Sequence, residues 1–452
     1  MLEAGASLHA RPIDARSLAL WVVAQEARGL LTRLARVEPF ALHSPMVPAA
    51  AISPAAQTGI ERYLAKERHE LRGRLGQYMA WLDGPEAMPA EAQRRFTFLR
   101  MRFNAVLHQF YIFSDVMTQR AEHETGVWLA GLDAVAADAL ALPACHFAAP
   151  PVVCFLDRGP GAAIRRAKTK MPGGGENPVA IIRVPRERMV GSGLASSLCH
   201  EVGHQVTALL GLIGSLTPKL SQLRNDRPEQ APAWDLYSRW LSEVLADFWS
   251  VVRVGVSSTI GLLGVMSLPR VFVFRLNLDD PHPMPWFRVK LSAEMGRAVY
   301  PHAQWERLAE VWESFFPLDE VDPRVRQLLE LLRETMPEYV SILVKHRPPS
   351  LGGRTLPEAA RVEERQPGRL LDWFERWRER PAEMRRAPPS LVFAAIGQAK
   401  ASGRISPERE SDCLTYLLKD WALRNTIDQS AACAANPAPQ RCWPGSRLQK
   451  VH

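Results

Sequence analysis

The sequence predicts a mainly α-helical protein of the α+β class, with a small β element between helical regions at either end of the chain. Apolar residues recur at three- and four-residue steps through most of the first 140 residues and again beyond residue 290, which is typical of amphipathic helices. Between these regions, segments 151–156 and 179–184 are short apolar runs with the character of strands. Because 452 residues are too many for one hydrophobic core, we expect several domains.

The first part of the chain is predicted to be almost entirely helical. Apolar periodicity indicates helices over 17–36, 55–82 and 90–125, and Pro-containing breaks such as Val37-Glu38-Pro39 separate them. No motif in this part points to chemistry. We therefore expect a helical N-terminal domain over residues 1–145.

A basic, glycine-rich loop lies between the two predicted strands. It begins near Arg165 and contains three consecutive glycines, Gly173 to Gly175. These glycines lack the Gly-Lys-Ser/Thr ending of a phosphate-binding loop. We therefore expect a flexible hairpin tip here and not a nucleotide site, within a central domain over residues 146–300.

The chain returns to helices in the last part, residues 301–452. Amphipathic periodicity predicts helices over 305–316 and 325–343, and a last helix over 408–428. The Pro- and Arg-rich stretch 347–389 mixes ten Arg with seven acids, a pattern more typical of a solvated helix face than of a partner-binding site. The Pro-rich tail that follows the last helix is predicted to be disordered.

The motif His200-Glu201-Val202-Gly203-His204 is the most informative feature for function. On a helix, residues four apart share a face, so the two imidazoles can bind one Zn²⁺ ion. Glu201 lies on a neighbouring face, where it can hold the water in the open coordination position. A helix is expected here because an apolar stripe surrounds the motif; it consists of Leu194, Leu198, Val202, Val206, Leu209 and Leu210.

Gly203 is unusual inside a helix, where it costs about 1 kcal/mol relative to Ala. We interpret it as leaving room for another element to approach the metal helix closely. Cys199 precedes His200 by one position and therefore points about 100° away from it. It is expected to be a small buried hydrophobic residue and not a ligand.

Two acids on a second predicted helix could complete the site. Glu243 and Asp247 are four residues apart in the run Trp240 to Trp249, among Leu, Val and Phe, and would share one helix face. Acids in such surroundings are costly to bury unless a partner such as a divalent cation compensates them. The alternative is a solvated helix edge in which the acids pair with Arg239 or Arg253.

Together, His-Glu-x-x-His and the later Glu-x-x-x-Asp resemble the gluzincin clan of zinc metallopeptidases. The resemblance covers about 50 residues and implies a zincin-like catalytic domain that hydrolyses peptide bonds. It implies that His200, His204 and Glu243 bind zinc and that Glu201 is the general base. It also implies that Asp247 accepts a ring N–H from a ligand histidine and so fixes its orientation.

Other zinc arrangements fit the sequence less well. A metzincin would need a third His soon after His204, and residues 205–210 contain none. Structural zinc sites usually have four Cys or His ligands, which are not clustered here. In zinc peptidases an edge strand before the zinc helix can bind an extended substrate by strand addition, and we expect segment 179–184 to have this role.

Peptide hydrolysis also requires a group that stabilises the oxyanion, and gluzincins supply it from outside the two zinc helices. The sequence offers His282 and Arg288, both in or beside the proline-rich segment 279–288, and Tyr237 on the helix of Glu243. Because proline-rich loops hold side chains at low entropic cost, the segment suits a catalytic or binding role. The choice among the three residues stays open.

Composition limits the remaining possibilities. The net charge is +8, but basic and acidic residues are interleaved, so nucleic-acid binding is not indicated. The six cysteines form no Cys-x-x-Cys pair and are expected to be reduced thiols in a cytoplasmic protein. Apolar segments 206–216 and 254–269 are shorter than the roughly 20 residues that a membrane span needs.

Two functions follow as expectations. The first is a zinc metallopeptidase that acts on a peptide or protein substrate. The second is a scaffold that keeps a zincin fold without catalysis and binds a protein partner through its helical lobes. A scaffold would be expected to have lost its base or a ligand, and the motif here is intact.

Overall fold

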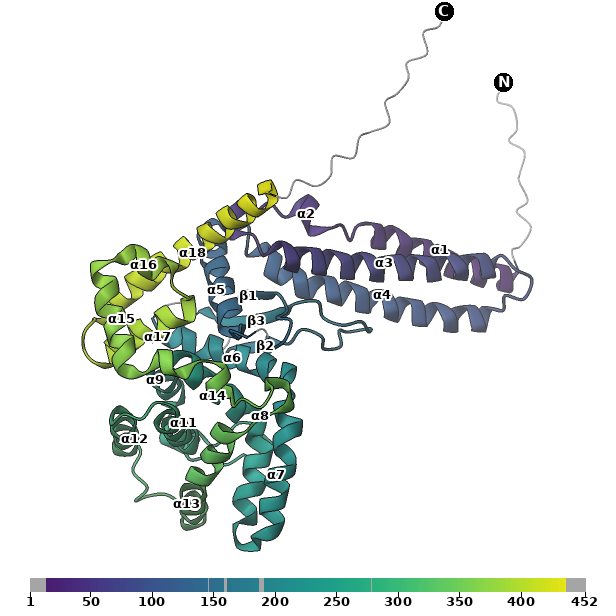
Figure 1. The fold of residues 1–452 in the computed structure, drawn as a ribbon. Helices are drawn as coiled ribbons and strands as arrows, with labels where there is room; N and C mark the ends of the chain where they lie inside the picture. Colours follow the sequence, from purple (N-terminus) through teal and green to yellow (C-terminus); the bar gives the residue numbers. More distant parts are fainter. Residues whose placement is uncertain (1–13, 145, 158–160, 187–190, 278, 436–452) are drawn as a thin grey trace, which may run out of the picture.

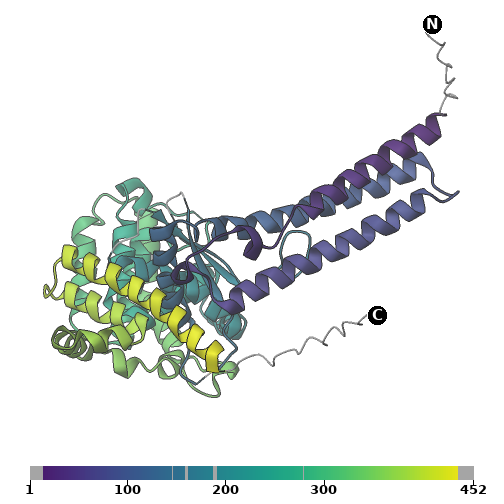
Figure 2. The same cartoon turned by 90° about the horizontal axis from the view of Figure 1, so that it is seen from above.

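The computed structural model describes residues 14–435 except 145, 158–160, 187–190 and 278. It is mainly helical with one small sheet, as predicted. Three long helices, α1 (Ala15–Ala35), α3 (Pro54–Leu82) and α4 (Pro89–Thr118), lie side by side and project from a helical body (Figures 1 and 2). We call these three helices the arm.

The arm has its own apolar core, which explains the periodicity of its sequence. Val23 and Leu30 of α1 pack with Leu71 of α3 and with Phe96 and Phe103 of α4. All three helices begin within two residues of their predicted starts. At the start of α3, the Ser53 side chain caps the helix by accepting a hydrogen bond from the backbone N–H of Ala56.

The predicted helix 90–125 is too long, because α4 ends at Thr118 and α5 (His123–Leu140) begins a new direction. The chain changes direction at Arg120, whose side chain is fully buried in the body. Its guanidinium pairs with Asp133 at 2.8 Å and donates to the carbonyl oxygen of Cys154 at 2.6 Å. This long-range pairing fixes the turn, and local periodicity does not reveal it.

The sheet has three strands in the described part of the chain: β1 (Val152–Asp157), β2 (Ala163–Arg165) and β3 (Ala180–Pro185). Their order is β1-β3-β2, with β1 parallel and β2 antiparallel to β3. The prediction that segment 179–184 is an edge strand is therefore wrong: β3 is central, and the edge next to it is β2.

Burial on both faces explains why β3 is central. Ile182 faces the core of the body, whereas Ile181 packs in a second cluster with residues of α3 and α4 at the base of the arm. A strand covered on both faces has a continuous apolar sequence, and this is what segment 179–184 shows. The same two-sided packing attaches the arm to the body.

The glycine-rich loop forms the tip of the β2–β3 hairpin, as predicted, but it is held against the arm. Gly173, Gly174 and Gly175 all have positive φ, which side chains other than glycine rarely adopt. The Tyr63 hydroxyl donates to the carbonyl oxygen of Gly174 at 2.9 Å, and the Gln109 amide donates to that of Pro172. These bonds oppose the predicted flexibility of the tip.

The body is built from helices around one continuous core. Its apolar cluster extends from Trp128 to Trp421, so both predicted domain boundaries, at 145 and at 300, fall inside it. Helix α5 contributes to this cluster and packs on α18 (Pro407–Ala435), which lies across the body in Figure 2. The body also contains α6 (Gly193–Leu209), α7 (Leu212–Asp226), α8 (Ala231–Val254), α9 (Val256–Met266), α10 (Arg270–Val273), α11 (Pro285–Val299), α12 (Gln304–Phe315), α13 (Pro323–Lys345), α15 (Pro367–Glu379), α16 (Pro381–Arg386) and α17 (Pro389–Ala401).

The C-terminal charged stretch has the predicted solvated face. In α15, Arg376 and Arg378 form ion pairs at the surface, while Phe374 and Trp377 are buried beneath them. The predicted disordered tail after residue 435 lies outside the described residues. Among the described residues, no helix has the length and apolar character that crossing a membrane requires.

Helices α6 and α8 approach each other most closely at Gly203. A Cβ atom placed there would lie 2.8 Å from Cα and 2.9 Å from the carbonyl oxygen of Ala246 on α8. Both atoms belong to the backbone and cannot move aside as a flexible side chain would. The interpretation of Gly203 as a site of close approach is confirmed.

We predict that Gly203→Ala destabilises the protein by about 1 to 3 kcal/mol, because the added methyl group forces α6 away from α8. Urea denaturation followed by circular dichroism would measure the change. The matched control is Gly214→Ala in α7, where a Cβ atom meets nothing within 4 Å; it should be neutral or stabilising by about 0.4 to 1 kcal/mol. Equal stability of the two variants would contradict the packing argument.

Candidate metal centre

The three ligands expected from the sequence converge between α6 and α8. Nε2 of His200 lies 3.3 Å from Oε2 of Glu243, and Nε2 of His204 lies 3.5 Å from Oε1 of the same carboxylate. One potential ligand atom from each residue lies within 4.8 Å of the other two. The cluster can therefore hold a metal ion.

The spacing fits a tetrahedral zinc ion well. With ligand bonds of about 2.0 to 2.1 Å, neighbouring ligand atoms of such a site are about 3.3 Å apart. Oε2 of Glu243 is also buried, and among the described residues it has no hydrogen bond of good geometry, although ring nitrogens of His200 and His282 lie 3.3 and 3.1 Å away. A buried carboxylate oxygen without a well-oriented hydrogen bond is suited to binding a cation.

Asp247 orients His200, the first of the three candidate ligands, by contacting its Nδ1 atom. Its Oδ1 lies 2.7 Å from Nδ1 of His200, which leaves Nε2 of that ring facing Glu243. Arg288, from α11, donates to the same carboxylate through Nε at 2.6 Å and Nη2 at 2.9 Å. The negative charge of Asp247 is thus compensated by His200 on one side and by Arg288 on the other.

These contacts argue against the solvated-edge interpretation of the acidic pair. Glu243 and Asp247 are buried, with 8% and 5% of their surfaces exposed. Arg253, one of the two arginines considered as a partner, instead lies beside Asp138 of α5, 3.6 Å from its carboxylate. The two acids belong to the metal cluster.

The pKa values of the clustered groups reflect the same packing. Burial opposes the charged form of His200, but the adjacent Asp247 carboxylate outweighs it and raises the pKa of His200 to about 9. Burial favours the neutral form of Glu243, but the surrounding imidazoles hold the pKa of this carboxyl well below its usual range. Binding of a metal must therefore displace a proton from the cluster.

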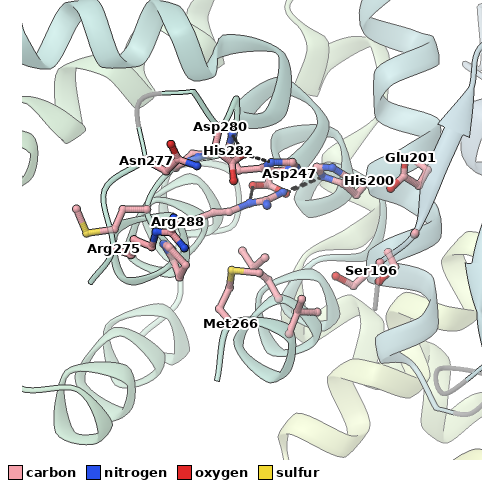
Figure 3. Close-up of a pocket in the computed structure, with 18 residues that line it drawn as sticks. Ser196, His200, Glu201, Asp247, Met266, Arg275, Asn277, Asp280, His282 and Arg288 are labelled. Carbon is pink, nitrogen blue, oxygen red and sulfur yellow. Dashed lines mark hydrogen bonds and ion pairs between the residues drawn. The ribbon is translucent and has the colours of Figure 1, made fainter. Parts of the chain in front are cut away.

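Glu201 lies beside the candidate ligands and is buried. It is 6% exposed, and burial raises its pKa. It lines a cavity of about 330 Å³ together with His200, Asp247 and Arg288. Figure 3 shows it on the opposite side of His200 from Asp247, so the His200 ring lies between the two carboxylates.

His282 is also part of this centre. It lies in the loop before α11, and its side chain is 46% exposed. Asp280, beside His282 in Figure 3, accepts from Nδ1 at 2.6 Å. Nε2 of His282 lies 3.1 Å from Oε2 of Glu243. The structure thus places this histidine at the metal cluster and fixes its orientation.

The other two oxyanion candidates have different surroundings. Arg288 lines the cavity but donates through two of its nitrogens to Asp247. Tyr237 is fully buried, donates to the carbonyl oxygen of Leu332 at 2.8 Å and stacks on Tyr339 at 4.0 Å. The Tyr237 hydroxyl is hydrogen-bonded in the core between α8 and α13. The expectation that Tyr237 could stabilise an oxyanion is therefore not supported by its position.

The cavity contains residues that the sequence reasoning did not single out. Ser196 lies one turn before His200 on α6, and its spacing could have revealed it. Arg275 and Asn277, from the loop after α10, line the far side of the cavity in Figure 3. No pattern in the sequence marks Arg275 or Asn277, because only the folding of the chain brings their loop to the cavity.

No protein-family model matches this chain, and no curated protein or solved structure matches it at a significant level. The interpretation of the site therefore depends on its own geometry.

We predict that Glu243→Ala abolishes stoichiometric zinc binding, because two imidazoles remain as ligands, and that Asp247→Ala weakens zinc affinity about 10- to 100-fold. Elemental analysis and competition with a chelator would measure both effects. Asp235→Ala is the matched control, since this acid is on α8 but half-exposed in an ion pair with Arg224. Full zinc content in Glu243→Ala would exclude Glu243 as the third ligand.

Proposed function

We propose that this protein is a zinc-dependent peptide hydrolase with a gluzincin-like, zincin-type site. The observation that carries the proposal is the convergence of His200, His204 and Glu243 beside a cavity that Glu201 also lines. Three protein ligands leave a fourth coordination position open, as catalytic zinc sites require and structural sites do not.

A zinc ion held by these residues would polarise the scissile carbonyl and activate a water molecule. Glu201 is then the group that accepts the proton from that water and passes it to the departing amine. Its shielding from bulk solvent keeps the proton on this carboxyl between the two steps. Asp247 keeps His200 in the orientation in which Nε2 faces the metal position.

His282 is the best-placed group to stabilise negative charge on the substrate carbonyl oxygen. Its ring borders both the cavity and Glu243, and Asp280 holds its other nitrogen. A donor held in advance costs little reorganisation when charge develops. Arg288 supports this chemistry indirectly, because it positions Asp247 and thereby His200.

An extended substrate would meet β2 and not β3. Gly161 and Ala162 line the cavity and lead directly into β2, one of the two edge strands of the sheet. An edge strand has unpaired backbone groups that can bind a peptide by strand addition. We therefore assign the role expected for segment 179–184 to β2.

The arm favours a second candidate function, the binding of a protein partner. It projects from the body and exposes Trp21, Phe98 and Met101, which are 57%, 66% and 61% exposed. Exposed apolar side chains of this size are typical of interaction surfaces. A scaffold that binds through the arm would not need Glu201 as a base.

We predict that Glu201→Gln retains the fold, the zinc content and the melting temperature of the wild type but loses peptidase activity, because size and shape are kept while the proton acceptor is removed. Cleavage of a mixed peptide library, analysed by mass spectrometry, would measure the loss. Glu229→Gln, in the 3₁₀ turn before α8, is the control. If the Glu201→Gln variant restores the phenotype of a deletion strain fully, the scaffold function is favoured.

We further predict that His282→Ala lowers kcat by about 10²- to 10³-fold with little change in KM, because the interaction is made mainly in the transition state. Steady-state kinetics on the best library peptide would test this, with zinc content measured in parallel. An unchanged kcat would exclude His282 from the reaction, and a loss of zinc would make it a fourth ligand.

A further inference from the structure

Arg275 is a cation at the cavity whose side chain has no partner among the described residues. It follows α10, lines the cavity and is exposed. Its guanidinium forms no hydrogen bond or ion pair with any residue that the structure describes. In Figure 3, Arg275 and Asn277 lie on the side of the cavity away from Glu201.

The acids that line the cavity are engaged elsewhere. Asp247 pairs with Arg288 and His200, and Asp280 pairs with His282. Glu201 lies at the opposite side, next to the ligand His200. Among the described residues, no carboxylate that lines the cavity is therefore paired with Arg275, and a ligand can supply one.

The wall between these two ends is apolar. Leu262, Val265 and Met266, at the end of α9, line the cavity between the zinc helix and the loop that carries Arg275. A volume of about 330 Å³ accommodates one or two amino-acid side chains. A ligand that fits has an apolar stem along α9 and an acidic group at Arg275.

The surface next to the cavity suits a polypeptide. Between Met266 and Arg275 the chain exposes Leu268, Val271 and Phe272, which are 41%, 71% and 48% exposed. Exposed apolar side chains in the segment that joins two cavity-lining residues can contact substrate residues beyond the one inside. A small polar metabolite would make no use of them.

We propose that Arg275 is a specificity-determining residue that binds a carboxylate on the substrate residue seated in this cavity. The proposal rests on the proposed function for the identity of the bond that is cleaved. The carboxylate belongs either to an acidic side chain or to the C-terminus of the peptide. A charged hydrogen bond of this kind, bidentate from a guanidinium, discriminates strongly against an uncharged amide.

Binding to the zinc-loaded Glu201→Gln variant tests the proposal without turnover. The probes are four dansyl peptides in two matched pairs. Dansyl-Ala-Ala-Leu is compared with its C-terminal amide, and dansyl-Ala-Glu-Ala amide is compared with dansyl-Ala-Gln-Ala amide. Fluorescence anisotropy should show about tenfold or tighter binding of the carboxylate in at least one pair, and the pair that responds identifies the source of the carboxylate.

The role of Arg275 is then read from three further substitutions in the same background. Arg275→Gln should remove the preference for the carboxylate and leave binding of the amide probes unchanged, and Arg275→Lys should restore part of it. Arg354→Gln, at an exposed arginine that does not line the cavity, should have no effect. A preference that survives Arg275→Gln would mean that the metal or another cation binds the carboxylate, and would overturn the proposal.

The two proposals fail in distinguishable ways. If wild-type protein cleaves library peptides without regard to acidic residues or free C-termini, and Arg275→Gln changes no probe affinity, the specificity proposal is wrong and the hydrolase function stands. If the probes bind through Arg275 but no peptide is cleaved, the carboxylate site stands and the hydrolase function is wrong.

Discussion

The contact between α6 and α8 at Gly203 is the constraint on which the metal centre depends. Because glycine has no Cβ, the backbone of α6 can approach Ala246 of α8 to within ordinary contact distance. His200 and His204 flank Gly203 on α6, and Glu243 and Asp247 flank Ala246 in the same way on α8. His200 and His204 meet Glu243 only at this separation, since their side chains are short and their donor atoms must share one point.

Charge compensation holds the rest of the centre around this contact. Asp247 is buried and would be costly to ionise alone, but Arg288 from α11 and His200 from α6 both contact it. Three helices are thereby joined by one carboxylate. Glu243 differs from Asp247, because one of its oxygens is buried without a good hydrogen bond. The polar contacts of Asp247 are thus made within the protein, whereas the Glu243 oxygen is suited to binding a cation.

The small sheet connects the arm to the body and places its edge at the cavity. Alternate side chains of β3 pack into the core of the body and against the base of the arm, so the sheet is covered on both faces. Of the two edge strands, β1 and β2, it is β2 that contacts α6 and follows the cavity-lining residues Gly161 and Ala162. The cavity is lined by Gly161 and Ala162, which precede β2, and by Leu262, Val265 and Met266 of α9.

The sequence by itself determined what depends on local spacing. The histidines four apart, the acids four apart, the break in propensity at Gly203 and the main helices of the arm could all be predicted, because helix geometry fixes which residues share a face. The tertiary structure alone decided what depends on contacts between distant segments. It placed β3 in the centre of the sheet, joined α5 to the body through Arg120, buried Tyr237 against Tyr339, and brought His282, Arg288 and Arg275 to one cavity. These outcomes follow from which surfaces are buried together, and that is a property of the whole packed chain, which no window of local sequence contains.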